Sequence, residues 1–261
     1  MKYDQLFNLF SIDSSASLVP SRVSAPSGFQ PSRQTTASPI DALQLQLRRL
    51  YYAVASPQKY QVVSTAKRSL DVVVSALALL ALSPVFLAVA LAVKLTDGGP
   101  AFFWQERVGL YGEVFQFPKF RSMISNAEAL KRDLLALNQH GEGVTFKMQD
   151  DPRVTRVGRF IRRYSLDELP QLWCVLKGDM SLVGPRPAVP SEVVRYADHH
   201  RNRLHPLPGL TCTWQVSGRS EIPFEQQVKM DEDYVQSRNF WMDLGLLAKT
   251  VPAVLSGRGA Y

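Results

Sequence analysis

The chain has 261 residues, of which 46% are hydrophobic, and its formal net charge is +7. This length allows one or two domains, and the composition supplies enough apolar side chains for a core. A basic balance suits nucleic acid, an anionic membrane surface or a phosphorylated substrate. No helix-turn-helix, RNP or zinc pattern occurs, so we expect no nucleic-acid partner. The two cysteines form no CxxC pair, and the N-terminus lacks the apolar segment of a signal peptide.

The first segment of the chain is poor in apolar residues. Residues 11–39 are rich in Ser, Pro, Gln and Thr, and we expect a disordered extension over residues 1–39 because little surface could be buried. From Ile40 to Val54, apolar residues recur at helical spacing, with Arg48 and Arg49 on the other side. Residues 40–66 are therefore predicted to form a short amphipathic helix and a linker. This helix would lie on a membrane surface or dock on the protein body, and both readings remain open.

One apolar run, from Leu70 to Val93, has the character of a membrane segment. From Val72 to Val93 a straight helix would extend ~33 Å, enough for a hydrocarbon core of ~30 Å. Ser83 and Pro84 fall in its middle. A proline inside a helix removes one hydrogen bond and costs about 3 kcal/mol. Each half alone would reach only ~17 Å, which is too short to cross.

Basic residues flank this run on both sides: Lys67 and Arg68 before it, Lys94 and Arg107 after it. A spanning helix usually has its basic bias on one side. Matching flanks therefore favour a re-entrant helix over residues 67–95, which bends at the Ser-Pro step and leaves by the face it entered. A kinked spanning helix remains the alternative, because proline is tolerated within membranes.

Short strands and one charged helix are predicted downstream. Ala101–Trp104 and Val114–Phe117 are typical of strands, and turns are expected at 98–100 and 111–113. Residues 127–137 predict a charged helix.

Arginine then recurs at every third position, at Arg153, Arg156, Arg159 and Arg162, with apolar residues between. This spacing predicts a helix with a basic stripe beside an apolar stripe. The basic stripe would be solvated or would contact phosphate or lipid headgroups.

The last part of the chain, from Phe240 to Leu255, keeps helical spacing of its apolar residues. Such a helix would face the core or rest at a membrane interface.

Two adjacent carboxylates, Asp167 and Glu168, follow the basic stripe. Ser165 and Glu168 fit a capping box, in which each side chain caps a backbone N–H at a helix start. Pro170 would be better tolerated if Asp167 were the cap, and both arrangements remain open. In either case Asp167 lies near a helix N-terminus, which favours its ionised form and a bound phosphate.

An ionised aspartate can attack phosphorus and form an acyl phosphate. An anionic substrate such as a nucleotide diphosphate-sugar must then be screened by cations, and Mg²⁺ and arginine both do this. Arg162 and Arg186 are the candidate arginines. Arg186 lies in the stiff turn Gly184–Pro187, which would fix its backbone.

Several motifs in this order resemble the bacterial sugar transferases, which are polyprenyl-phosphate phosphoglycosyl transferases. They are the stretches 105–109, 119–123, 162–172, 177–187 and 214–219. The resemblance covers Lys67 to Tyr261, and the Ser83-Pro84 break is similar to that of the monotopic branch. It implies an α/β, membrane-associated monotopic catalytic domain over 96–261, with short strands and amphipathic surface helices. The end of the chain is similar to the usual family terminus, so we expect it to be complete there. Larger members carry spanning helices ahead of this region that residues 1–66 do not supply.

The resemblance also implies roles for individual residues. Asp167 and Glu168 match the catalytic dyad, with Asp167 as nucleophile and Mg²⁺ contact. Arg162, Pro185 and Arg186 match substrate-binding positions. The motif at 214–219 is similar to that of members that transfer hexose-1-phosphate. Cys212 departs from the glycine usual in the family, which raises the question of a positive φ there.

We therefore expect transfer of a sugar-1-phosphate from a UDP-sugar to undecaprenyl phosphate, through a covalent intermediate on Asp167, to start an exopolysaccharide or O-antigen repeat. The chain would sit among lipids of the inner (cytoplasmic) membrane, with its catalytic domain on the cytoplasmic face. Whether it forms a homo-oligomer stays open, as does the identity of the sugar. The alternative is a non-enzymatic, single-pass membrane adaptor with a basic cytoplasmic face, which would have no use for the carboxylate pair between arginines.

Overall fold

The computed structural model of the chain describes residues 64–127, 129–130, 148, 150–197, 199–257 and 259. The predicted segment 1–39 and residues 40–63 of the predicted segment 40–66 lie outside these residues, as does most of the charged helix predicted at 127–137. The described part combines helices with two small sheets, so the α/β class is confirmed.

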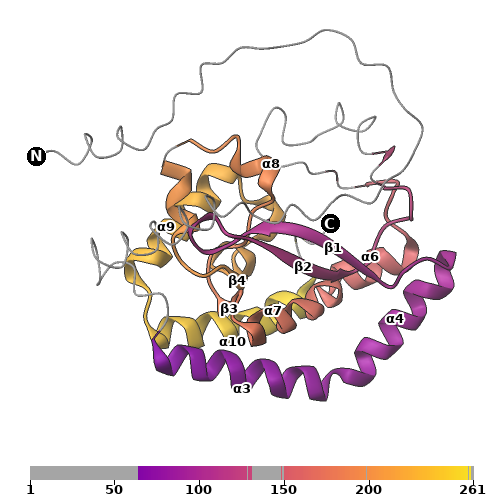
Figure 1. Cartoon of the computed structure of the whole chain (residues 1–261), viewed down its shortest axis with the longest axis horizontal. Coiled ribbons are helices and arrows are strands. Elements are labelled where there is room, and N and C mark those ends of the chain that lie inside the picture. The colour runs from indigo at the N-terminus through magenta and orange to yellow at the C-terminus, as the bar shows by residue number, and fades with distance from the viewer. Residues whose placement is uncertain are drawn as a thin grey trace, which may run out of the picture. The chain divides into compact units, whose positions relative to one another are not determined.

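The apolar run forms two helices, α3 (Thr65–Ala81) and α4 (Ser83–Asp97), which are bent by 60° with Leu82 between them (Figure 1). Pro84 lies in the first turn of α4, where a missing N–H leaves no bond unmade. Among the described residues, neither helix alone has the length and apolarity to cross a membrane, but the bent pair has both when taken together. The pair is compatible with a broken span or a re-entrant loop.

Polar side chains at the start of α3 tie this helix to the rest of the protein. The Lys67 ammonium lies 2.5 Å from the Asp243 carboxylate, and Arg68 donates to the carbonyl oxygens of Val175 and Leu176. Asp71, which is buried, accepts from the Leu182 N–H at 2.9 Å. The two basic residues before the apolar run therefore hold the helix in place instead of acting as free membrane flanks.

Strands β1 (Phe102–Val108) and β2 (Val114–Phe120) form an antiparallel hairpin around a turn at Leu110–Gly112 (Figure 1). Both predicted strands are confirmed, and each is longer than expected. The register pairs Phe103 with Lys119 and Gln105 with Phe117, so these side chains share one face of the hairpin.

Helix α6 (Arg156–Arg163) begins after Thr155, whose hydroxyl accepts from the Gly158 N–H at 2.8 Å. Arg153 precedes this helix and is buried in an ion pair with Asp151 at 2.6 Å. The predicted basic stripe is therefore wrong at its first position, because a local carboxylate partner removes Arg153 from the helix face.

Ten further short elements and helices complete the described fold. They are η3 (Leu166–Gln171), α7 (Leu172–Lys177), β3 (Ser181–Val183), α8 (Pro190–Val193), η4 (His199–Leu204), β4 (Gly209–Thr211), η5 (Trp214–Val216), η6 (Arg219–Glu221), α9 (Phe224–Ser237) and α10 (Phe240–Ser256). Strands β3 and β4 pair in parallel. Helix α10 matches the helix predicted at the end of the chain.

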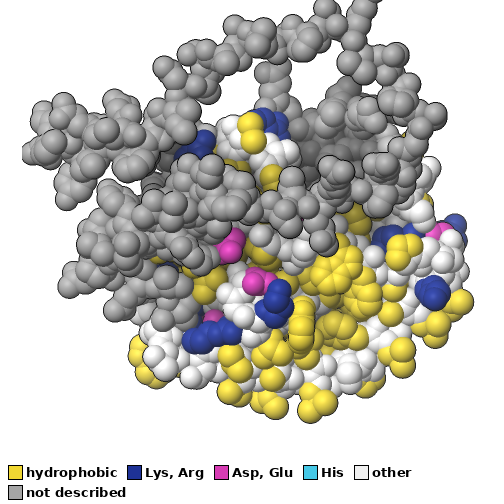
Figure 2. Space-filling model, viewed as in Figure 1, with side chains coloured by type: hydrophobic (Ala, Val, Ile, Leu, Met, Phe, Trp, Pro, Cys, Tyr) yellow, Lys and Arg dark blue, Asp and Glu magenta, His cyan; other side chains and the backbone are white. Residues whose placement is uncertain are grey.

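Two apolar clusters hold these elements together. One centres on Phe117, Val175 and Met180, and the other joins Val89 of α4 to Ile161 of α6. The outer faces of α3, α4 and α10 are apolar but exposed, and Figure 2 shows hydrophobic side chains along the edge formed by α3 and α4. An exposed apolar area of this kind marks an interaction surface.

Candidate active site

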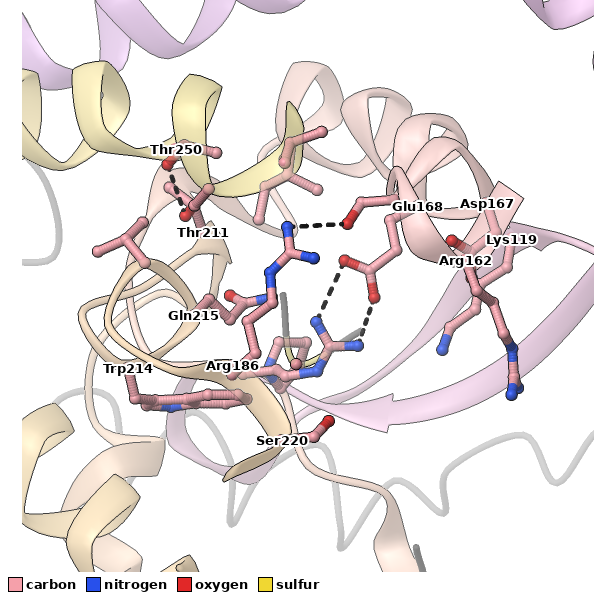
Figure 3. Close-up of a pocket in the computed structure, with 18 of the residues that line it drawn as sticks. Lys119, Arg162, Asp167, Glu168, Arg186, Thr211, Trp214, Gln215, Ser220 and Thr250 are labelled. Atoms are coloured by element: carbon pink, nitrogen blue, oxygen red, sulfur yellow. Dashed lines mark hydrogen bonds and ion pairs between the residues drawn. The ribbon is translucent and has the colours of Figure 1, made fainter. Parts of the chain in front are cut away.

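A cavity of about 580 Å³ lies where η3, β2, α6, the loop after β3 and helix α10 meet (Figure 3). It is lined by Arg162, Asp167, Glu168 and Arg186, so the structure brings four of the predicted site residues together. Pro185 is fully buried in the turn that carries Arg186. Ser83 and Pro84 are not among the lining residues, although the neighbouring Leu82 is.

The carboxylate pair lies on a short 3₁₀ segment, and neither predicted cap is formed. Ser165 has a left-handed backbone with φ 52°, and its side chain accepts no capping bond. Glu168 turns instead toward Arg186, 18 residues away. Pro170 is accommodated inside the 3₁₀ segment. A left-handed serine two residues before Asp167 is an unusual, strained conformation of the kind found at functional sites.

Glu168 and Arg186 form a two-contact ion pair, drawn in Figure 3. Arg186 Nη2 donates to Glu168 Oε1 at 2.5 Å, and Nη1 donates to Oε2 at 3.3 Å. Burial raises the pKa of Glu168, but the Arg186 charge and hydrogen bond outweigh it and lower this pKa to about 2. Glu168 is therefore ionised, and both of its oxygens are occupied by the guanidinium that it orients.

Asp167 is buried, and its carboxylate has no hydrogen-bond partner within the described part of the chain. Burial and then the Glu168 charge raise its pKa to about 6, against the opposing charges of Lys119, Arg162 and Arg186. We predicted that a helix N-terminus would favour the ionised form, but burial dominates here. Asp167 is thus the carboxylate whose oxygens remain free to react, and it is largely ionised at neutral pH.

Two cations lie on the Asp167 side of the carboxylate pair. Arg162 is held by its Nε, which donates to the Ser122 hydroxyl at 2.9 Å. Lys119 comes from β2, with its ammonium 5.2 Å from the centre of the Phe117 ring. Burial and then the charges of Arg107 and Arg186 lower the pKa of Lys119 to about 7. Figure 3 shows Lys119 and Arg162 together, away from Arg186.

Lys119 was not predicted as a site residue. The motif at 119–123 contains both Lys119 and Ser122, and this was the available signal. Arg121 of the same motif points elsewhere and pairs with Asp97 at the end of α4. Lys119 lies within β2, whereas Arg121 follows its last residue, Phe120, so the two side chains are not held on one strand face.

The turn that carries Arg186 is fixed by a close approach of two backbones. A Cβ atom at Gly209 would lie 2.1 Å from Gly184 N, so only glycine fits there. Gly184 donates to Thr211 O at 3.0 Å, and Arg107 Nη1 donates to Pro187 O at 2.8 Å. These contacts from β1 and β4 hold the stiff turn, so Arg186 is positioned before any substrate arrives.

Arg219 is a further cation that sequence reasoning did not place in the site. Its backbone is left-handed with φ 54°, and its Nη2 lies 3.5 Å from the Ser165 hydroxyl. Its Nη1 is buried without a hydrogen-bond partner in the described residues. The two left-handed residues thus meet directly beside the carboxylate pair.

Cys212 does not have a positive φ, so its replacement of the usual glycine causes no backbone strain. Its thiol is buried and donates to Gln215 Oε1 at 3.1 Å.

Three side chains away from the cavity present possible metal ligands: His199, His200 and Glu225 lie within 4.8 Å of one another. His200 Nδ1 accepts the Ala197 N–H at 3.1 Å, which leaves the proton on Nε2, 3.0 Å from Glu225. A metal would require that nitrogen unprotonated, so this arrangement favours a hydrogen bond.

The family model described as bacterial sugar transferase matches residues 62–257. Over 199 residues the chain is 47% identical to the undecaprenyl-phosphate galactose phosphotransferase of Salmonella typhimurium, covering 75% of this chain and 41% of that protein. It is 44% identical to the exopolysaccharide production protein ExoY of Sinorhizobium fredii, covering 75% and 88%. It is 40% identical over 207 residues to the UDP-glucose:undecaprenyl-phosphate glucose-1-phosphate transferase of Caulobacter vibrioides, covering 76% and 73%.

The chain thus spans less than half the length of the Salmonella relative and most of the length of ExoY. The family match includes the bent helix pair, the hairpin and every residue that lines the cavity except Gly259. On this match the chain belongs to the bacterial sugar transferase family.

Proposed function

We propose that the chain transfers a hexose-1-phosphate from a UDP-sugar to undecaprenyl phosphate, as the names of its relatives suggest for those proteins. The observation that carries this proposal is the unequal pair of carboxylates. Glu168 is occupied by Arg186, whereas Asp167 is buried, accepts no hydrogen bond from the described residues and is flanked by cations. An aspartate in this setting is suited to attack an anionic phosphorus centre.

In the first step, an Asp167 carboxylate oxygen would attack the β-phosphorus of the UDP-sugar. A bond from oxygen to phosphorus forms, the bond to the bridging oxygen breaks, and UMP leaves with the electron pair. The sugar-1-phosphate is then held on Asp167 as an acyl phosphate.

In the second step, a phosphate oxygen of undecaprenyl phosphate attacks the same phosphorus. The Asp167 carboxylate is released, and undecaprenyl-diphosphate-sugar is formed. This product would start an exopolysaccharide or O-antigen repeat.

The cations have separate tasks in this scheme. Arg186, oriented by Glu168, and Arg162, oriented by Ser122, would contact phosphate oxygens. Lys119 would neutralise the charge that gathers around Asp167. Each contact is preorganised, so little reorganisation is required when charge develops on the phosphoryl group.

Mg²⁺ fits this set of donors. It is usually bound through one or two carboxylates, substrate phosphates and water, and Asp167 offers one unpaired carboxylate facing the cavity. Asp167 would hold the ion, which would screen the diphosphate. Activity that persists in EDTA would exclude this role.

We also propose that α3 and α4 form a re-entrant segment in the inner membrane, with the cavity on the cytoplasmic side. The exposed apolar faces of α3, α4 and α10 support it, as does the 60° bend at Leu82. Trp241 of α10, which is 75% exposed, is a residue type enriched at membrane interfaces.

A panel of UDP-sugars tests the proposed reaction. Purified protein with undecaprenyl phosphate should release UMP from one or a few UDP-hexoses and form a lipid-linked diphosphate sugar. Arg162→Ala should reduce this turnover, because a charge-assisted contact is worth roughly 1.5–3 kcal/mol. Absence of UMP release with every member of the panel would overturn the proposal.

A further inference from the structure

One part of the cavity is apolar and has no task in the phosphate chemistry. We propose that this part, which we call the apolar lobe, binds the isoprenoid units next to the phosphate of the lipid acceptor. The inference rests on the proposed function. The lobe consists of Leu82, Leu166, Leu169, Leu247, Ala253 and Val254, all half-buried and all lining the cavity that contains Asp167.

The 3₁₀ segment separates the polar and apolar parts of the cavity. In a 3₁₀ helix, residues three apart lie on the same face. Leu166 and Leu169 therefore share a face. Asp167 and Glu168 lie between them in sequence, so their carboxylates are on the other two sides of the segment. Leu166 packs against the cluster of Val89 and Ile161, and Leu169 against that of Phe117. This wall of the lobe is therefore held rigidly next to the nucleophile.

Helix α10 supplies the opposite wall and is apolar on two faces. Leu247 and Val254, two turns apart, line the cavity. Trp241 and Leu255 lie on the outer face and are 75% and 69% exposed. A helix of a soluble domain usually has one apolar face toward its core. Two such faces suit a helix that divides an apolar lobe from a lipid surface.

Thr250, the polar residue of α10 that lines the cavity, already has hydrogen-bond partners. Thr250 Oγ1 donates to Leu246 O at 2.8 Å and lies 2.8 Å from Thr211 Oγ1. A sugar placed in the lobe would leave its hydroxyls without partners, which is costly in an apolar site. A polar chain is excluded for the same reason, whereas a hydrocarbon chain with a terminal phosphate suits both parts of the cavity.

Leu82 connects the lobe to the exposed apolar surface. It is the residue between α3 and α4, and it lines the cavity. Its neighbours Leu80 and Leu87 are 74% and 72% exposed. The bend thus places one end of the lobe beside the surface along which the rest of a long isoprenoid chain would lie.

Two pairs of matched variants test the lobe. Leu247→Gln and Val254→Gln place an amide on its wall, whereas Trp241→Gln and Leu255→Gln place an amide on the outer face of α10. For each variant in lipid nanodiscs, two quantities are measured: UMP released in the first turnover without acceptor, and lipid-linked product formed with undecaprenyl phosphate. The ratio of the second rate to the first isolates use of the acceptor.

We expect this ratio to fall about tenfold or more in Leu247→Gln and Val254→Gln, the scale on which apolar pockets discriminate, and to stay unchanged in the outer-face variants. A ratio unchanged in all four variants would overturn the inference. Equal losses on both faces would also overturn it, since they would indicate general contact of α10 with lipid. If Leu247→Gln does not fold, Val254→Gln decides. Failure of the proposed function has a different signature, namely no UMP release by the wild type.

Discussion

Removal of the Arg186 side chain should leave Glu168 as a buried carboxylate without its partner. The two side chains are 22% and 18% exposed, so solvent screens this pair only weakly. Burial raises the pKa of Glu168, Arg186 lowers it, and the result is about 2 against an ordinary 4.5. At ~1.4 kcal/mol per pH unit, this difference corresponds to about 3 kcal/mol. We therefore expect Arg186→Ala to lower the free energy of unfolding at pH 7 by about 3 kcal/mol, in the range for a broken buried pair.

The stability deficit of Arg186→Ala should also depend on pH in a definite direction. In the wild type, the lowered pKa stabilises the fold fully above about pH 4.5, and this stabilisation is lost as the pH falls toward 2. In Arg186→Ala, burial is opposed only by the charges of Lys119 and Arg107, so we expect the pKa of Glu168 to rise above its unfolded value. Protonation then favours the folded state, so the deficit should shrink as the pH is lowered from about 7 to about 5. Glu168→Gln in the same chain should restore part of the stability at pH 7.

Urea unfolding in detergent, followed by tryptophan fluorescence at both pH values, measures these differences. Lys177→Ala is the control, because the Lys177–Asp179 pair is 52% and 28% exposed and should contribute less than about 1 kcal/mol. The reasoning is refuted if Arg186→Ala costs no more than Lys177→Ala, or if its deficit does not depend on pH.

Three further predictions address other parts of the structure. UMP release in the first turnover should increase as Asp167 ionises near pH 6 and decrease above about pH 7 as Lys119 loses its proton. Lys119→Arg should then abolish the decrease in UMP release above about pH 7. An unchanged decrease would show that Lys119 does not cause it. Gly158→Ala should lower the unfolding free energy by about 3 kcal/mol or more, because its Cβ would lie 1.8 Å from Ser122 O. Gly245→Ala, with open space around its Cβ, should be neutral or stabilise by up to ~1 kcal/mol, and equal melting temperatures of these two variants would contradict this account. Single cysteines at Ser64 and Thr96, both exposed, in a chain without its native cysteines, should both be protected from an impermeant thiol reagent in spheroplasts, and labelling of only the first would indicate a spanning helix.

Local patterns in the sequence predicted the elements well. Proline and serine in the apolar run mark the point where α3 ends and α4 begins, and short apolar patches mark β1 and β2. These features depend on neighbours in sequence, so they can be read without a fold. The stiff turn around Arg186 is a feature of the same kind.

The contacts that the sequence did not predict are made with partners distant in sequence. Local sequence makes Glu168 a candidate for a helix cap, but its partner Arg186 lies 18 residues away. The sequence places Lys67 beside the apolar run as a basic flank, yet it pairs with Asp243, 176 residues away. Lys119 and Arg219 lie in the motifs at 119–123 and 214–219, but only the folded chain places them around the carboxylates. The residue types of the site could therefore be predicted, whereas the division of tasks within it could not.

The central claim is that Asp167 carries the phosphosugar, and peptide mass spectrometry tests it most directly. Wild-type protein incubated with the reactive UDP-sugar and no lipid acceptor should give a peptide whose mass is increased by the phosphosugar, with the modification on Asp167. Addition of undecaprenyl phosphate should remove it and yield the lipid product. Lipid-linked product formed at a substantial rate by Asp167→Asn, or an adduct on Glu168 in place of Asp167, would contradict the account.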